Sequence, residues 1–378
     1  MKLLILTCST GGGHTSAAHA IAQAAADAGA ECKIEDALRF LPGLDGKVIS
    51  YGHTFVYRHL PNLFGVGYKY EQRSGAGAFR LECYRGARAL GLYIADGCYD
   101  AVVSVHIFAS FMLAKLRKDG QLSIPTANVA TDYTCSPGFA ECKLDMNFVP
   151  HGLAPEFTGC GLDAERVFET GIPVAKEFDE RTPKKLARAV LGLPEEGKLC
   201  LLMCGSMGCG PMEELADSLS RAMPEDGMLA VFCGTNTKLY EALSGCGLEN
   251  VRVIGFTKRV SVWMDAADLM ISKPGGSTST ETMSKRLPMI IINAVPGCET
   301  KNLEYLTGRG CALSAPDEEI PPLARRVLED DSCIEGLRAN MAVSYTHLGA
   351  YGCDDTLRRH LQAHRHALTG PDSGRPGR

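Results

Sequence analysis

The 378-residue sequence lacks several features that would place it in a functional class. None of its 16 cysteines forms a Cys-x-x-Cys pair, and Cys200, Cys204 and Cys209 lack a matching histidine or cysteine cluster, so we expect reduced cysteines in a cytosolic protein rather than a zinc site. No apolar run has the length of a transmembrane helix, and no signal peptide precedes the first strand-like segment. The net charge of −5 argues against general nucleic-acid binding.

The sequence has no P-loop and no Gly-x-Gly-x-x-Gly fingerprint, but it has two other glycine-rich turns. The first, Ser9–His14, follows the strand-like run Leu3–Leu6 and precedes a helix predicted over Thr15–Ala28. Three consecutive glycines carry a large ordering cost, so they predict close approach of another group to the backbone. His14 would face any ligand bound there; the alternative is a helix cap or a solvent-exposed residue.

The second turn, Lys273–Glu281, lies between the apolar run Leu269–Ile271 and a helix predicted over Thr280–Arg286. Unpaired backbone N–H groups and the helix dipole make such a turn suitable for a phosphate or diphosphate. Glu281 lies one turn into the helix, where it could accept a hydrogen bond from a sugar hydroxyl. The alternative is an ordinary Gly-Ser turn before an N-capped helix.

Both halves of the chain alternate buried strands with helices, which predicts an α/β fold with two parallel sheets. The expected strands are Leu3–Thr7, Ala101–Val105, Thr126–Ala130, Met146–Val149, Leu199–Cys204, Leu229–Cys233, Val251–Ile254, Leu269–Ile271 and Met289–Ile292. Two such units imply a cleft with ligands at the carboxyl ends of the strands. We expect a first domain over residues 1–172, a second over 173–343, and a basic, disordered tail over 344–378 in which 357–366 could form a short helix.

The two turns, taken together, resemble those of glycosyltransferase family 28, in particular its diacylglycerol glycosyltransferase branch. Further matching segments follow in the family's order over residues 1–342: Ser104–His106, Ala130–Tyr133, Gly171–Val174, Gly205–Pro211, Cys233–Asn236, Gly255–Thr257 and Pro296–Asn302. The resemblance implies a glycosyltransferase-B fold, in which two Rossmann-like domains face a central cleft. The acceptor would bind the first domain, and a UDP-hexose donor the second.

The resemblance also implies roles for individual residues around the donor. Glu281 would hold the ribose, Phe256 would contact uracil through main-chain atoms, and Glu299 and Asn302 would read the hexose hydroxyls. Relatives often carry glutamine where Cys298 stands, which leaves the hexose open, and Glu299 and Asn302 could instead be solvated loop residues. The donor-binding residues implied are Gly12, Gly13, Gly205, Ser206, Met207, Phe256, Gly275, Gly276, Ser277, Thr278, Glu281, Glu299 and Asn302.

Such enzymes usually invert the anomeric centre in one displacement and require neither a metal nor a cofactor, which fits the absence of an Asp-x-Asp motif here. The displacement needs a base for the acceptor hydroxyl, and histidine titrates near neutral pH. His14 is the first candidate because the family places that residue between acceptor and donor. Asp132 could orient or assist it, and His106 is a rival; Asp132 and His106 could equally be structural.

Residues 55–93 are rich in aromatic side chains, and between 55 and 90 six basic residues stand against two acidic ones. This combination suits the interface of an anionic membrane. Pro61, Gly65 and Gly67 interrupt the helical pattern, which favours a docking loop over a regular core helix. The alternative is a buried pair of helices with a solvated basic face.

The sequence therefore predicts a peripheral enzyme on the cytoplasmic face of the cell membrane that transfers a hexose from a UDP-sugar to diacylglycerol and forms a β-glycolipid. Glucose is favoured because bacterial relatives commonly use it. The alternatives are an N-acetylglucosaminyltransferase acting on a polyprenyl-linked acceptor, a UDP-sugar 2-epimerase, and a non-catalytic binding protein.

Overall fold

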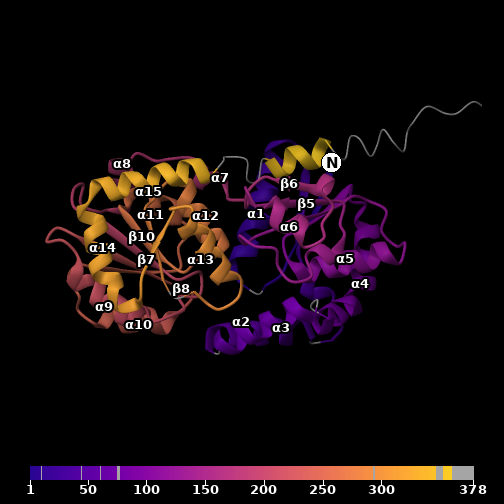
Figure 1. Ribbon diagram of the computed structural model, residues 1–378, viewed down its shortest axis with the longest axis horizontal. Helices are drawn as coiled ribbons and strands as arrows, with labels where there is room; N and C mark the ends of the chain where they lie inside the picture. Colours follow the sequence, from indigo (N-terminus) through magenta and orange to yellow (C-terminus); the bar gives the residue numbers. More distant parts are fainter. Residues whose placement is uncertain are drawn as a thin grey trace, which may run out of the picture.

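A computed structural model describes residues 1–9, 11–43, 45–59, 61–74, 77–292, 294–345 and 352–359. Two parallel six-stranded sheets form two lobes that lie side by side (Figure 1). Alternate residues of the central strands enter different cores: Leu4 and Leu6 pack on one face of the first sheet, and Leu3 and Ile5 on the other. Burial on both faces explains why these strands are continuously apolar, and the expected pair of α/β domains is confirmed.

The first sheet has the strand order β2-β1-β3-β4-β5-β6. Its strands are β1 Lys2–Thr7, β2 Glu31–Asp36, β3 Ala101–Ser104, β4 Thr126–Val129, β5 Met146–Val149 and β6 Val167–Glu169. Its helices are α1 Gly12–Asp27, α2 Asp45–His59, α3 Pro61–Ser74, α4 Gly77–Gly97, α5 Ile107–Lys118 and α6 Ala154–Gly159, with short 3₁₀ turns at Ala37–Phe40, Ala140–Cys142 and Ala164–Arg166.

The second sheet has the strand order β12-β11-β10-β7-β8-β9, reached through the short helix α7 Lys176–Asp179. Its strands are β7 Leu199–Met203, β8 Met228–Gly234, β9 Val251–Gly255, β10 Leu269–Ser272, β11 Met289–Ile291 and β12 Leu313–Ser314. Its helices are α8 Lys184–Leu191, α9 Met212–Ala222, α10 Thr237–Gly245, α11 Val260–Ala266, α12 Gly276–Ser284, α13 Cys298–Gly308, α14 Ile320–Glu329 and α15 Asp331–Ser344, with a 3₁₀ turn at Asp317–Glu319.

All nine strands expected from the sequence are present, within one or two residues of the predicted ends. The three strands that were not predicted, β2, β6 and β12, all lie at the edge of a sheet. None of them is fully buried, and β2 mixes charged with apolar residues. Edge strands lack the apolar run by which the central strands are recognised.

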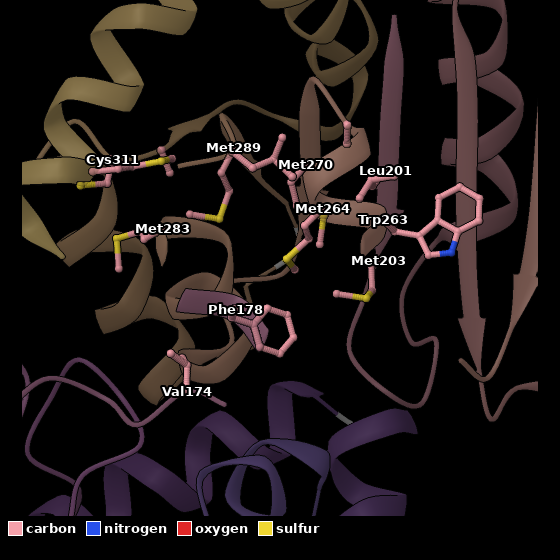
Figure 2. Close-up of a cluster of buried hydrophobic side chains, with 14 of the residues drawn as sticks. Val174, Phe178, Leu201, Met203, Trp263, Met264, Met270, Met283, Met289 and Cys311 are labelled. Carbon is pink, nitrogen blue, oxygen red and sulfur yellow. The ribbon is translucent and has the colours of Figure 1, made fainter. Parts of the chain in front are cut away.

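One core of the second domain is rich in methionine, whose flexible side chain fills irregular gaps. Figure 2 shows Met203, Met264, Met270, Met283 and Met289 gathered with Trp263. Val174 and Phe178, from the segment between the domains, belong to this core, as does Tyr133 from the first domain. The first domain is thus anchored in the hydrophobic core of the second.

Residues 45–59, 61–74 and 77–97 form three consecutive helices, so the expected docking loop is wrong. Pro61 is the first residue of α3, where its missing N–H is not needed. Glycine is required at position 65, inside α3, because a Cβ there would stand 2.5 Å from Pro296 of the second domain. Within the part of the chain that the structure describes, no helix is long and apolar enough to cross a membrane.

The expected disordered tail over 344–378 is also wrong in part. Residues 352–359 form a helix beside the first domain, drawn in yellow near the N-terminus in Figure 1. Its Cys353 contacts Thr170, and Arg358 donates to the Ala25 carbonyl. Buried Cys353 and Leu357 join a core of the first domain, so the chain returns from the second domain to the first. The remainder of the tail, with most of the predicted helix at 357–366, lies outside the described residues.

Candidate active site between the domains

The two glycine-rich turns predicted from the sequence meet across the domain interface. Ser277 Oγ donates a hydrogen bond to the Gly13 carbonyl oxygen over 3.0 Å. A Cβ on Gly12 would lie 2.7 Å from Ser206 Oγ, and one on Gly13 would lie 2.9 Å from Ser277 Oγ. The close approach that the glycines predicted is therefore made by the opposite domain, and three predicted loops converge on one point.

Both turns pass into helices earlier than predicted. Helix α1 begins at Gly12 rather than Thr15, and α12 begins at Gly276 rather than Thr280. The capping positions, Gly11 and Gly275, have no side chain to occupy the first N–H groups. Two helix N-termini, each with partial positive charge and no side-chain cap from its own N-cap residue, thus lie together, which is an arrangement suited to an anion.

His14 lies at this junction with a fixed orientation. Its Nδ1 lies 3.0 Å from the Val105 carbonyl oxygen and 3.0 Å from Thr131 Oγ1. A carbonyl can only accept, so Nδ1 carries the proton and Nε2 keeps its lone pair. Burial lowers the pKa of His14, whereas the charge of Asp132 acts in the opposite direction. The imidazole is therefore held neutral, as a general base requires.

Asp132 connects His14 to the second domain. Its Oδ1 accepts a hydrogen bond of 2.7 Å from Asn302 Nδ2. Burial raises the pKa of Asp132, while Asn302, His14 and the Gly276 N–H favour the ionised form. Gly276 must be glycine here, because a Cβ would lie 1.8 Å from the Thr131 carbonyl oxygen.

His106, the rival base, has a structural role. Its Nδ1 accepts from the Phe108 N–H over 3.1 Å and so caps the N-terminus of α5. The side chain is buried, and its ring meets His14 edge-on with centroids 4.5 Å apart. His106 therefore supports the position of His14.

Glu299 and Asn302 are buried in α13, so their interpretation as solvated loop residues is wrong. Glu299 Oε1 lies 3.2 Å from Lys273 Nζ, and its Oε2 accepts from the Val295 N–H. Asn302 accepts from the Tyr133 N–H and donates to Asp132 and to the Pro274 carbonyl. Glu299 therefore holds the segments around Lys273 and Val295 together, and Asn302 joins the two domains.

Glu281 is buried inside α12, and burial together with the nearby charge of Glu177 raises its pKa to about 8. The carboxyl is therefore mostly protonated at neutral pH, when it can both donate and accept a hydrogen bond. Glu177 comes from α7, in the segment that joins the domains. Burial also raises the pKa of Glu177.

The remaining predicted donor residues follow the carboxyl ends of β7, β9 and β10. Gly205 has φ +71° and begins the turn that contains Ser206 and Met207. The Ser206 carbonyl accepts from the Thr235 N–H, which joins this turn to the one after β8. Phe256 follows β9 with 67% of its surface exposed. Thr278 is half-buried in the first turn of α12.

Sequence reasoning gave no role to two tyrosines in the cleft. Tyr133 stacks on Tyr305 with ring centroids 4.3 Å apart, and its hydroxyl lies 2.6 Å from Thr280 Oγ1. Tyr68, on α3, packs its ring against Gly297, and its hydroxyl is buried without a hydrogen-bond partner. Burial raises its pKa, as do the nearby Cys298 and Asp132. Tyr133 could have been identified from the family-like segment Ala130–Tyr133. Nothing in the sequence distinguishes Tyr68 from the other aromatic residues of 55–93.

Among the described residues, no group of three or more His, Cys, Asp or Glu side chains could hold a metal ion. The junction offers a fixed neutral imidazole beside a carboxylate and two helix N-termini. Such a site can accept a proton and stabilise a departing anion. Two Rossmann-like domains that meet at such a junction are the arrangement of the glycosyltransferase-B fold.

Comparisons with known proteins give the family. Residues 14–174 match monogalactosyldiacylglycerol (MGDG) synthase, and residues 199–343 match the glycosyltransferase family 28 C-terminal domain. The second half of the chain thus matches glycosyltransferase family 28 and the first half matches MGDG synthase, so the resemblance seen in the sequence is confirmed.

Individual relatives agree with this assignment. The chain is 28% identical over 284 residues to a processive diacylglycerol beta-glucosyltransferase of Bacillus subtilis (strain 168), covering 74% of this chain and 72% of the relative. It is 28% identical over 360 residues to the protein of the same name from Bacillus cytotoxicus, covering 91% and 90%. The fold is similar to that of Anabaena HepE in complex with UDP, with a TM-score of 0.58, 15% identity and coverage of 96% and 100%.

Proposed function

We propose that this glycosyltransferase moves a hexose, with glucose favoured, from a UDP-sugar to diacylglycerol at a membrane surface, with inversion at the anomeric carbon. The observation that carries the proposal is the junction of the two glycine-rich turns, where His14 has its Nε2 free for a proton beside the uncapped N-terminus of α12. The names of the relatives and the bound UDP of the fold neighbour support the choice of acceptor and donor.

The reaction follows from these groups. His14 Nε2 takes the proton of the acceptor hydroxyl while the hydroxyl oxygen attacks the anomeric carbon. The bond from that carbon to the diphosphate oxygen breaks, and UDP leaves with the electron pair. The N–H groups at Ser277 and Thr278 and the dipole of α12 stabilise the charge that develops, which is often the largest catalytic contribution. Asp132 stabilises the imidazolium that forms.

For the donor, we assign the diphosphate to the turn Gly275–Thr278 with Gly12 and Gly13 facing it. The ribose is assigned to Glu281, and the uracil to the exposed main chain around Phe256 and the turn Gly205–Met207. Because Asn302 already bonds Asp132, its contact with the hexose requires that the domains separate first and close again over the donor. Glu299 would meet the hexose from its position beside Lys273.

The acceptor side is assigned to α2 and α3, which lie along the lower edge of the molecule in Figure 1. The exposed apolar side chains of these helices recur at helical spacing: Val48, Tyr51 and Phe55 on α2, and Leu63, Val66 and Tyr70 on α3. Each set follows an i, i+3, i+7 pattern and forms one stripe on its helix. Stripes of this kind, left in solvent within a basic segment, suit the interface of an anionic membrane.

Helix α3 joins this surface to the cleft, because its other side carries Gly65 and Tyr68 against Pro296 and Gly297. A buried hydroxyl without a partner costs free energy, so we assign the Tyr68 hydroxyl to a hydrogen bond with bound substrate. Helix α3 would then contact the membrane with its apolar stripe and the substrate with its opposite side, which carries Tyr68.

The test is turnover of UDP-glucose and UDP-galactose by the full chain on phosphatidylglycerol liposomes with and without diacylglycerol. We expect a glycolipid only with diacylglycerol, and its loss in His14→Ala. Release of UDP without glycolipid, or no reaction with either sugar, would reject diacylglycerol as the acceptor. A parallel reaction with a polyprenyl-linked acceptor, and mass analysis for an epimerised UDP-sugar, would then distinguish the alternatives.

A further inference from the structure

A second cleft, of about 420 Å³, opens in the second domain away from the donor site. It is bounded by the end of α11, the C-terminus of α12, the segment that enters α8, and α15. Five cationic side chains line it against a single carboxylate, Asp265: Arg181, Lys184, Lys285, Arg286 and Arg338. The catalytic junction is formed at the opposite end of α12.

Two of these cations are neutralised by neighbours. Lys285 Nζ lies 2.8 Å from Asp265 Oδ2 in a pair that is almost fully buried, and Lys184 pairs with Asp268. Within the described ranges, Arg181, Arg286 and Arg338 pair with no carboxylate. Arg181 donates to the Ser284 carbonyl over 3.1 Å, which fixes its direction. Burial lowers the pKa of Arg181, and the charges of Arg286 and Arg338 lower it further while that of Asp265 opposes them, so Arg181 is repelled by the other two guanidinium groups.

The backbone at Arg286 points to the same site. Arg286 ends α12 with φ +50°, and the N–H groups of Arg286 and Leu287 bond back to Met283 and Thr282. This is the Schellman motif, in which glycine is the usual residue because other residues are strained in this conformation. An arginine occupies the position instead, and its side chain lines the cleft.

We propose that this cleft binds a water-soluble, phosphate-bearing anion. Guanidinium groups match phosphate oxygens with paired hydrogen bonds, and three of them would compensate a doubly charged phosphate. The volume suits a small metabolite. Met264, Leu287 and Ala339 provide an apolar wall for the rest of the molecule.

The position of the cleft favours a soluble ligand over a lipid headgroup. Helices α8 and α15 lie along the upper edge of the molecule in Figure 1, whereas α2 and α3 lie along the lower edge. With the apolar stripes of α2 and α3 on a membrane, the cleft faces the aqueous phase.

From the same position, a bound ligand could affect how the two domains meet at the catalytic junction. Two segments connect the domains, and both leave the second domain beside this cleft. The first, residues 173–183, contains Arg181. The second follows α15, which carries Arg338, and leads to the helix at 352–359 on the first domain. An anion held by Arg181 and Arg338 joins both connections and so restrains the movement of the domains. Bound ligand is therefore expected to change the rate of domain closure without touching the donor.

The experiment is calorimetric titration of the full chain with inorganic phosphate and with glycerol 3-phosphate, in saturating UDP so that the donor site is filled. We expect one site, with affinity reduced tenfold or more in Arg286→Gln/Arg338→Gln. The control Arg326→Gln removes an exposed arginine of α14 that does not line the cleft, and it should bind as wild type does. Arg338→Gln alone, on the exposed side of α15, gives a second test should the double variant fail to fold.

Absence of binding to the wild type, or equal binding to the variants, would overturn the proposal. The lipid alternative is tested with vesicles of phosphatidylglycerol. We expect Arg286→Gln/Arg338→Gln to bind them as wild type does. Weaker vesicle binding by this variant, without a soluble anion site in the wild type, would identify a headgroup as the ligand and reject the soluble source. None of these measurements depends on transferase activity.

Discussion

Asn302 Nδ2 in the second domain and Asp132 Oδ1 in the first are joined by a hydrogen bond of 2.7 Å. Asp132 also contributes to the charge around His14, and Asn302 also holds the Tyr133 N–H. The contact between the domains and the electrostatic surroundings of His14, the proposed base, thus depend on the same two side chains. Residues outside this pair can therefore affect catalysis through the fit of the domains.

Gly276→Ala should separate the domains, because the new Cβ would lie 1.8 Å from the Thr131 carbonyl oxygen. We expect kcat/KM to fall about 100-fold, the effect of displacing reacting groups by roughly 1 Å. Small-angle scattering should show a more extended particle. Gly308→Ala, in α13 with open space around the site of its Cβ, is the control. Equal activity of the two variants would contradict the close contact.

The acidic limb of the pH profile should report His14. Because burial lowers the pKa of His14, activity should fall only below its ordinary value of 6.5. Asp132 raises that pKa, so Asp132→Asn should move the acidic limb of kcat/KM to still lower pH while reducing the plateau. Measurement of kcat/KM from pH 4 to 9 tests this. A limb that moves toward higher pH would contradict the assignment of His14 as the base.

Glu281 should make the protein less stable as the pH rises. Its pKa is about 8 in the folded state, compared with an ordinary value of 4.5. Below pH 4.5 both states are protonated; between 4.5 and 8 only the unfolded state ionises, so the free energy of unfolding falls. The loss by pH 8 is on the order of 3–5 kcal/mol.

Glu281→Gln should therefore raise the melting temperature at pH 8 and leave it nearly unchanged at pH 4.5. Thermal unfolding across this range measures the effect. Glu177→Gln should weaken the pH dependence, because Glu177 contributes to the raised pKa. The same slope in Glu281→Gln as in wild type would show that this carboxyl is ionised in the fold.

Tyr68→Phe should separate stability from activity. The hydroxyl has no partner in the protein, so its removal should leave stability unchanged or raise it by about 1 kcal/mol. If the hydroxyl bonds substrate, kcat/KM should fall about tenfold, the equivalent of one such hydrogen bond. Tyr240→Phe, at a tyrosine of α10 that is 42% exposed, is the control. A loss of stability with unchanged activity would assign Tyr68 to packing instead.

Val66→Asp should weaken binding to anionic vesicles. Val66 is 65% exposed in the middle of the α3 stripe, so the charge should have little effect on folding. We expect vesicle affinity to fall roughly tenfold, from the lost apolar burial of about 1.5 kcal/mol. Val343→Asp introduces the same charge at an 83% exposed position on α15. Equal vesicle binding by both variants would reject the α3 stripe as a membrane contact; sedimentation with liposomes measures it.

The success of the sequence predictions depended on burial. Central strands such as β1 and β7 were predicted because both faces are covered and nearly every residue is apolar. The edge strand β2 was missed because its polar residues are allowed at a sheet edge. The helices at 45–74 were read as a loop because Pro61 and Gly65 usually interrupt helices. Here Pro61 begins a helix, and Gly65 allows close contact with Pro296, a residue that only the tertiary fold brings near.

The sequence by itself determined the two α/β units, the two glycine-rich turns and His14, because local apolar runs and glycine clusters carry their own conformational requirements. The tertiary structure decided what those turns meet. It brought Gly13 into hydrogen-bond contact with Ser277 and placed His14 so that its Nδ1–H donates to the Val105 carbonyl. It also placed Asn302 against Asp132. Each of these contacts spans more than 90 residues, and such pairings follow from how two folded domains pack rather than from any local pattern.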